Sequence, residues 1–278
     1  MELRITILAE NSVVVPFDVV GEHGFSAFVE MDGFNFLFDT GQGKALVNNA
    51  LALKKDLSSA QFLYLSHGHY DHTGGMVDLL KIKSPIDVYA HPDMFSERYW
   101  FKGGVQKYIG VQFSKEYLES LGANFKFHKD FQEIAKNVYS SGEVERNTPF
   151  EKIDAEMKVK NENGELVQDQ IWDDYSMAIK TSKGLVVILG CAHAGIVNIL
   201  NHFIKQTGEK EIYAVLGGTH LGFANDEQID ETVKVLDKYN IQKLGVSHCT
   251  GLKVSAKLYN KLGDDRFFFA SVGATLEI

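Results

Sequence analysis

A short segment, residues 66–75, concentrates side chains that bind metal ions. It reads Ser-His-Gly-His-Tyr-Asp-His-Thr-Gly-Gly and contains His67, His69, Asp71 and His72. Alternate side chains of an extended segment point the same way, so His67 and His69 can approach one ion together. If Asp71 and His72 begin a helix, they can turn toward a second ion. A polar surface loop is the alternative, but this density of ligands predicts a metal site.

The flanking sequence predicts the elements that position this segment. An apolar strand ends directly before it, and a helix after it runs to Leu80. We expect strands at 3–9, 26–30, 34–39, 61–65, 86–90, 176–181, 185–189, 211–216, 243–247 and 266–270, and further helices at 44–53, 195–204, 226–239 and 253–262. Strands followed by a helix and a strand in each half indicate two packed sheets with helices outside. We expect one domain, residues 1–278, with an irregular, aromatic-rich insert or lid at about 93–154.

The string His67-x-His69-x-Asp71-His72 resembles the signature of the metallo-β-lactamase superfamily. Asp39, at the end of the strand 34–39, resembles the carboxylate that supports the metal loop in that superfamily. The resemblance implies an α/β fold, an αββα sandwich of the metallo-β-lactamase type, with a two-metal site at the sheet edges.

Further motifs are similar to one subfamily. It carries the label 7,8-dihydropterin-6-yl-methyl-4-(β-D-ribofuranosyl)aminobenzene 5′-phosphate synthase. The motifs are Glu22-His23-Gly24, Gly142-Glu143-Val144-x-Arg146, Gly190-Cys191-Ala192-His193-Ala194-Gly195, Gly217-Gly218-Thr219-His220-Leu221 and Ser247-His248-Cys249-Thr250-Gly251.

Lined up by strand order, the resemblance implies two further metal ligands, His193 and His248, each at a strand end before a helix. The segment Gly190-Cys191-Ala192-His193 falls where the superfamily carries a bridging aspartate. The neutral imidazole of His193 offers one lone pair, so it can complete one ion's shell but cannot bridge two. His220 is assigned to substrate contact or proton transfer. Glu143 could replace a histidine ligand, and His23 could equally be a capped surface residue.

These residues predict a metal-dependent hydrolase that uses a metal-bound hydroxide on a small ester or phosphoester. Asp71 would hold the attacking water, and His220 would protonate the leaving group. Arg146, and less securely Arg98 and Lys102, are candidates to bind an anionic group of the substrate. We expect one or two divalent ions, with zinc as the default; imidazole and carboxylate ligands also suit iron or manganese.

Two other functions remain open. The subfamily label implies a transferase, a pterin-ribofuranosylaminobenzene phosphate synthase, whose pocket could be built from Tyr99, Trp100, Phe101 and Tyr108 of the insert. A non-hydrolytic module that binds iron, for redox chemistry or sensing, is the second. Turnover and the identity of the bound metal distinguish the three.

Amino-acid composition limits the classes of binding partner and the cellular compartment that we expect. The 278 residues are 45% hydrophobic and carry a formal charge of −9, without a basic stripe, so we expect a globular protein with a small-molecule substrate and no nucleic-acid partner. The N-terminus lacks a signal peptide pattern, and no apolar run could span a membrane. Cys191 and Cys249 cannot form a disulfide framework and fit the cytoplasm. Each is expected to be a small buried residue, although a thiol beside a metal could be ligated or oxidised. The oligomeric state is left open.

Overall fold

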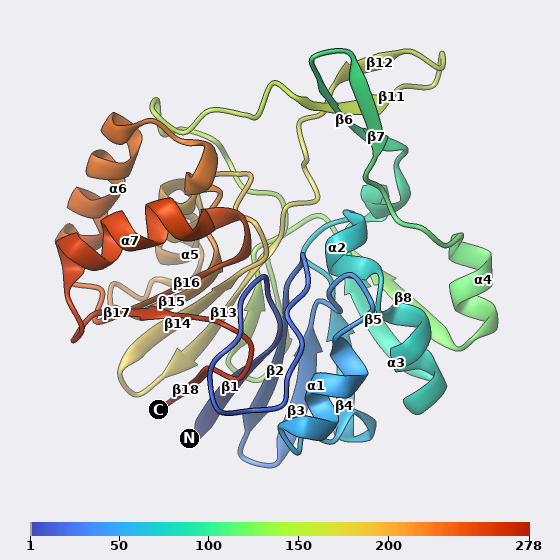
Figure 1. The fold of residues 1–278 in the computed structure, drawn as a ribbon, viewed down its shortest axis with the longest axis horizontal. Coiled ribbons are helices and arrows are strands. Elements are labelled where there is room, and N and C mark those ends of the chain that lie inside the picture. The colour runs from blue at the N-terminus through green and yellow to red at the C-terminus, as the bar shows by residue number, and fades with distance from the viewer. Residues whose placement is uncertain (1) are drawn as a thin grey trace.

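The computed structural model describes residues 2–278 and places two seven-stranded sheets face to face between two layers of helices (Figure 1). β14 (Gly184–Leu189) explains this layering, because every one of its residues is buried. Val186 and Ile188 pack between the sheets, whereas Leu185 and Val187 pack against the helices. A strand that is apolar on both faces needs a covering layer on each side. The predicted αββα sandwich is confirmed.

The first sheet has the strand order β18-β1-β2-β3-β4-β5-β8. Its strands are β1 (Leu3–Ala9), β2 (Ser26–Met31), β3 (Phe34–Phe38), β4 (Ala60–Tyr64), β5 (Ile86–Ala90), β8 (Ala123–Phe127) and β18 (Thr275–Glu277). Pairing is antiparallel from β18 to β3 and parallel from β3 to β8. Its outer face packs against α1 (Leu46–Ala52), α3 (Met76–Ile82) and α4 (Lys115–Ser120).

The second sheet has the order β17-β16-β15-β14-β13-β10-β9. Its other strands are β9 (Gln132–Ala135), β10 (Val138–Ser140), β13 (Ser176–Thr181), β15 (Ile212–Gly218), β16 (Lys243–Ser247) and β17 (Phe267–Phe269). Pairing is parallel from β14 to β17 and antiparallel from β9 to β14. Its outer face packs against α5 (Ile196–Thr207), α6 (Asp226–Lys238) and α7 (Gly251–Leu262).

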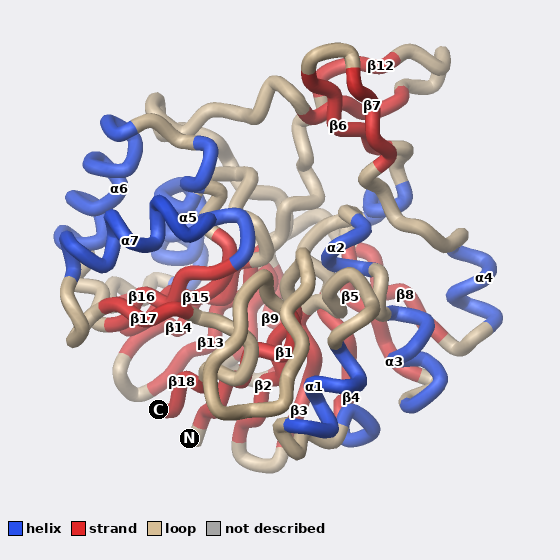
Figure 2. Tube along the Cα trace, viewed as in Figure 1, coloured by secondary structure: helices blue, strands red, loops and turns tan. Residues whose placement is uncertain are grey.

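A third, four-stranded sheet stands apart from the sandwich, at the top of Figure 2. Its order is β12-β11-β6-β7, with strands β6 (Arg98–Lys102), β7 (Val105–Tyr108), β11 (Met157–Lys160) and β12 (Leu166–Gln168). The sequence prediction of an irregular insert at 93–154 differs from this in two ways. Within that range β8, β9 and β10 belong to the main sheets, and half of the small sheet comes from the chain after residue 154.

The remaining elements are one-turn helices in the loops. They are α2 (Tyr70–Thr73) and the 3₁₀ helices η1 (Leu57–Ser59), η2 (Pro92–Phe95), η3 (Leu221–Phe223) and η4 (His248–Thr250). α2 follows β4 of the first sheet, whereas η3 and η4 follow the parallel strands β15 and β16 of the second. Among residues 2–278, no helix is long and apolar enough to cross a bilayer.

Candidate metal centre

A first group of histidines forms where β4 and β14 end. His67 and His69 follow β4, and His193 follows β14. His67 Nε2 lies 2.9 Å from His69 Nδ1, and the His193 ring centroid lies 4.9 and 5.1 Å from those of His67 and His69. One nitrogen from each of the three rings lies within 4.8 Å of the other two. Three buried imidazoles at this spacing can bind one ion, and we call them the first triad.

Gly68 lets the first triad form because its backbone passes very close to its neighbours. A Cβ at Gly68 would lie 1.9 Å from the Met94 carbonyl oxygen. The Gly68 N–H donates to Asp173 Oδ2 at 2.8 Å, and that carboxylate also accepts a hydrogen bond from the buried Arg98 guanidinium at 2.6 Å. Arg98 therefore ties the small sheet to the metal loop.

A second group gathers around Asp71. Asp71 Oδ2 lies 3.1 Å from His23 Nε2, 3.3 Å from His248 Nε2 and 3.9 Å from His72 Nε2. Burial alone would raise the pKa of Asp71, but His72, His23 and His248 hold it well below its usual range. The ionised carboxylate can thus share a cation with the imidazoles. We call Asp71, His72 and His248 the second triad.

Buried acceptors orient the rings of the second triad from behind. Asp39 Oδ2 accepts a hydrogen bond from His72 Nδ1 at 2.6 Å, as the sequence predicted for this carboxylate. Asn11 Oδ1 lies 3.2 Å from His248 Nδ1, and Glu10 accepts from the His248 backbone N–H at 2.7 Å. A hydrogen bond at Nδ1 leaves Nε2 as the lone-pair donor, which is the tautomer that a metal ligand needs.

The protonation of the first triad also suits a cation. Burial lowers the pKa of His67 and His193 well below the usual histidine range and that of His69 to about 3, so all three are neutral. His69 Nε2 and both ring nitrogens of His193 are buried without a hydrogen-bond partner in the described structure. Unpaired buried polar atoms are costly. A bound divalent ion would satisfy the lone pair of His69 Nε2 and that of one His193 nitrogen, so the residues present fit a metal.

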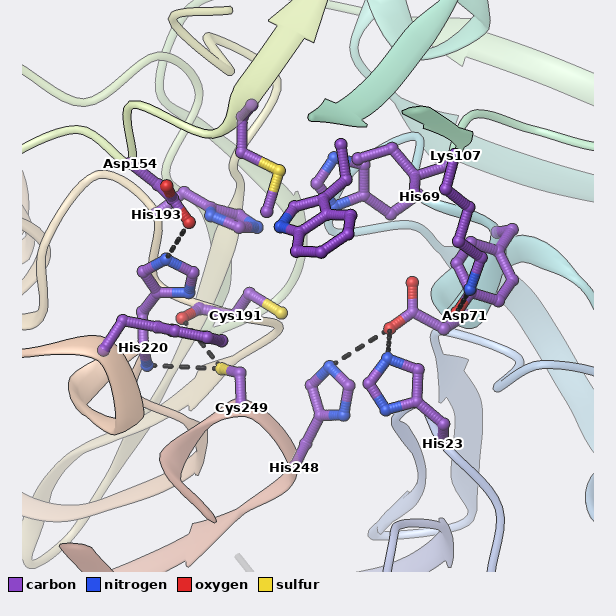
Figure 3. Close-up of a pocket in the computed structure, with 15 residues that line it drawn as sticks. His23, His69, Asp71, Lys107, Asp154, Cys191, His193, His220, His248 and Cys249 are labelled. Carbon is purple, nitrogen blue, oxygen red and sulfur yellow. Dashed lines mark hydrogen bonds and ion pairs between the residues drawn. The ribbon is translucent and has the colours of Figure 1, made fainter. Parts of the chain in front are cut away.

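A cavity of about 290 Å³ opens beside both triads (Figure 3). Its polar wall includes His69, Asp71, His193, His220 and His248, together with both cysteines. Apolar and aromatic side chains complete the lining: Tyr70, Trp100, Ile109, Met157 and Phe223. A small organic molecule with a flat apolar part fits this combination.

His220 and Asp154 face each other at one end of the cavity, 3.7 Å apart between Nε2 and Oδ2 (Figure 3). The His220 ring also lies 4.4 Å from that of His193. Burial lowers the pKa of His220, but Asp154 and the Cys249 thiol together raise it to about 9. His220 carries a positive φ of 55°, as do Asp39, Ala192 and His248 with values from 51° to 58°. Such conformations are uncommon outside glycine and cluster at functional sites.

The structure does not bring all predicted residues to this cavity. Arg146 donates to the Ile171 carbonyl oxygen at 3.0 Å, lies over the Trp172 ring, and does not line the cavity. Its expected contact with substrate has no support in this geometry.

Three weaker candidates are also engaged elsewhere. Glu143 bonds His91 at 3.0 Å and pairs with Lys129, so it is not a replacement ligand. Arg98 is buried against Asp169 and Asp173. Lys102 pairs with Glu156.

The cavity also contains residues that sequence reasoning missed or left undecided. Of the insert aromatics only Trp100 reaches it, while Tyr99 and Tyr108 pack against each other. Lys107 and Asp154 line it but stand in no local motif, so no sequence signal could have found them. The subfamily motif Glu22-His23-Gly24 did include His23, whose Nε2 lies 3.1 Å from Asp71 Oδ2.

Comparison with known proteins agrees with this architecture. Residues 19–197 match the sequence profile of the metallo-beta-lactamase superfamily. Over 280 residues the chain is 32% identical to 7,8-dihydropterin-6-methyl-4-(beta-D-ribofuranosyl)-aminobenzene-5'-phosphate synthase of Methanocaldococcus jannaschii, covering 95% of this chain and 92% of that protein.

Solved structures give the same result. The chain superimposes on Tm1679, a metal-dependent hydrolase of the beta-lactamase superfamily, with a TM-score of 0.84 and 30% identity over 99% of both chains. It shares its fold with Zn²⁺-bound PqqB from Methylobacterium extorquens, with a TM-score of 0.58 and 14% identity over the full length of both. The chain belongs to the metallo-beta-lactamase superfamily.

Proposed function

We propose that this protein is a metal-dependent hydrolase acting on a small ester or phosphoester. The observation that carries the proposal is the pair of triads, both of which reach one cavity, together with the buried nitrogens of His69 and His193 that have no partner in the described structure. The first triad would hold one divalent ion and the second triad another. Zinc is the default, and iron or manganese suits the same imidazole and carboxylate ligands.

A divalent ion in such a site lowers the pKa of bound water toward neutrality, so that hydroxide is available for attack. Asp71 serves as a ligand and positions the attacking water, because its Oδ2 lies at the centre of the second group of histidines. His220, held by Asp154 at the end of the cavity, is placed to give a proton to the leaving group. A positioned general acid contributes typically 10²–10⁴-fold to the rate.

The lining also indicates the substrate. Trp100, Met157 and Lys107 come from the small sheet and line the cavity. This sheet therefore covers the cavity and determines which substrates can bind. Lys107 is the only lysine or arginine among the lining residues, and its Nζ donates to the Tyr70 hydroxyl at 3.0 Å. We assign to Lys107 the anion-binding role that the sequence analysis expected of Arg146. A small molecule is the proposed partner, and two unpaired cysteines agree with the proposed cytoplasmic location.

A transferase is the second candidate, and two observations favour it. The relative from M. jannaschii is named as a synthase and is similar over nearly the whole chain. The aromatic side chains that line the cavity, Tyr70, Trp100 and Phe223, could also stack on a planar ring such as a pterin. In this reading the same Asp71 and His220 would manage protons during bond formation.

One set of measurements separates the candidates. Protein purified without added metal is analysed for metal content per chain, and the same sample is assayed against phosphodiester, phosphomonoester, lactone and thioester panels. The synthase reaction is assayed in parallel. Turnover of an ester by protein holding about two ions supports the hydrolase. Product formation in the synthase assay alone supports the transferase, and bound iron without either turnover supports the redox or sensing module.

A further inference from the structure

We propose that Cys191 is a thiolate ligand shared by both metal positions, an inference that rests on the metal centre of the proposed function. Between the end of β14 and His193 the chain has no carboxylate that could bind ions of both triads. Cys191 occupies that place in the chain, two residues before His193.

Cys191 is placed between the triads. Its Sγ lies within 4.8 Å of a ring nitrogen of His67, from the first triad, and of His72, from the second. It lies within the same distance of a ring nitrogen of His248, and 3.3 Å from His72 Nε2. Figure 3 shows its side chain directed into the cavity, between His193 and Asp71. The sulfur is therefore near ligand atoms of both groups.

The other polar groups at this place are unable to bridge. A neutral imidazole has one lone pair for a metal, whereas a thiolate has several. The nearby carboxylates are not available: Asp39 accepts from Ser66 and His72, and Asp174, whose Oδ2 accepts from the Ala194 N–H, does not line the cavity. Asp71 groups with His23 and His248 on the side of the second triad.

Cys249 provides a contrast within the same cavity. Its Sγ accepts from the His220 N–H at 3.2 Å and donates to the Cys191 carbonyl oxygen at 3.4 Å. Both hydrogen bonds are with backbone, and in Figure 3 this sulfur points toward His220. The Cys249 sulfur also lies within 4.8 Å of Cys191 Sγ and of a His248 ring nitrogen, but it belongs to no group that includes a residue of the first triad. A Cβ on Gly218 would lie 2.7 Å from it, so glycine at 218 makes room for the thiol. We assign Cys249 as a positioning residue that fixes the Cys191 backbone.

A shared thiolate has chemical consequences. The Cys191 side chain is buried, and a cysteine binds a metal ion as the thiolate. When a divalent ion binds, the S–H bond breaks, a sulfur–metal bond forms, and the proton leaves to solvent without any change of oxidation state. Thiolate ligands select zinc or iron over manganese or magnesium.

X-ray absorption at the zinc edge tests the inference on the full-length chain loaded with Zn²⁺ alone. Sulfur lies about 2.3 Å from zinc, and nitrogen or oxygen at about 2.0–2.2 Å. With two zinc ions per chain, a shared Cys191 gives about one sulfur neighbour per zinc. Cys249→Ser should keep that sulfur shell, whereas Cys191→Ser should lose it. Circular dichroism shows whether each variant is folded.

Each other outcome overturns the inference in a recognisable way. About half a sulfur per zinc means a terminal ligand on one ion, and no sulfur means that neither cysteine binds. If the sulfur shell is lost in Cys249→Ser but kept in Cys191→Ser, then Cys249 is the metal ligand and Cys191 is not. If Cys191→Ser does not fold, the sulfur count of the unmodified protein and of Cys249→Ser still decides. A protein that binds no zinc at all removes the proposed metal centre itself, which distinguishes that failure from the loss of the thiolate alone.

Discussion

Asp39 Oδ2 lies 2.6 Å from His72 Nδ1, and both side chains are fully buried. The other oxygen of the same carboxylate accepts the Ser66 backbone N–H at 2.7 Å. One side chain from the end of β3 thus fixes both the backbone entering the metal loop and the ring of a ligand within it. His72 Nε2 is left facing Asp71 and Cys191.

Replacement of this carboxylate should weaken metal binding. The amide in Asp39→Asn has no negative charge and only one oxygen that accepts hydrogen bonds, whereas the carboxylate accepts with both. We therefore expect zinc affinity to fall by roughly 10–100-fold. Competition with a chromophoric chelator measures the affinity. Asp87→Asn, an exposed aspartate on β5, is the matched control and should bind like the unmodified protein. Equal affinity in Asp39→Asn would show that the Asp39 contact does not tune the site.

Arg98 should stabilise the fold without touching substrate. Arg98→Met leaves Asp169 and Asp173 buried without their counter-charge, which should cost about 3–5 kcal/mol in the free energy of unfolding. Lys102→Met, on the same strand, removes an exposed pair and should change the free energy of unfolding far less. Urea denaturation compares the two variants. Similar losses in both would contradict the anchoring role of Arg98.

Glu151 should make stability depend on pH. Burial raises the pKa of Glu151 to about 7, against the lowering effect of the Val197 and Asn198 N–H groups. The folded pKa lies above the unfolded one, so this contribution is fully present below pH 4.5 and is lost as pH rises through 7.

The Glu151→Gln variant tests that dependence. It cannot titrate, so its free energy of unfolding should vary less between pH 5 and 8 than that of the unmodified protein, by on the order of 2–3 kcal/mol. Denaturation at several pH values measures both. Parallel curves for the two proteins would rule out a contribution from Glu151.

His220 should act on turnover and not on metal binding. We expect His220→Gln to lower kcat by roughly 10²–10⁴-fold on the best substrate of the panel, because the leaving group loses its proton donor. Metal content should stay unchanged. His128→Gln, a histidine outside both triads, should leave both quantities as they are. A loss of bound metal in His220→Gln would instead make His220 a ligand.

Local sequence patterns predict the metal-binding loop and most of the strands. His67, His69, Asp71 and His72 lie within six positions, and their surroundings follow from one strand and one turn, so the sequence alone predicts the group. Strands such as β14 are equally visible, because their apolar residues are continuous.

Contacts between segments that are distant in the chain could not be predicted from local sequence patterns. The small sheet pairs β6 with β11, which lie more than fifty positions apart, and this pairing brings Lys107 and Trp100 over the cavity. Asp154 meets His220 only after both loops are placed. Arg146 is close to a site motif in the chain, yet its guanidinium is held by Ile171 and Trp172. Proximity in sequence did not fix the direction of that side chain.

The number of zinc ions bound per chain shows whether the two triads form a metal centre. Zinc bound per chain is measured by plasma mass spectrometry after dialysis, for the unmodified protein, His67→Ala, His248→Ala and the control His128→Gln. We predict about two ions in the unmodified protein and in the control, and a loss of bound zinc in both triad variants, with circular dichroism unchanged. Wild-type zinc content in both His67→Ala and His248→Ala would show that the two triads do not bind the ions.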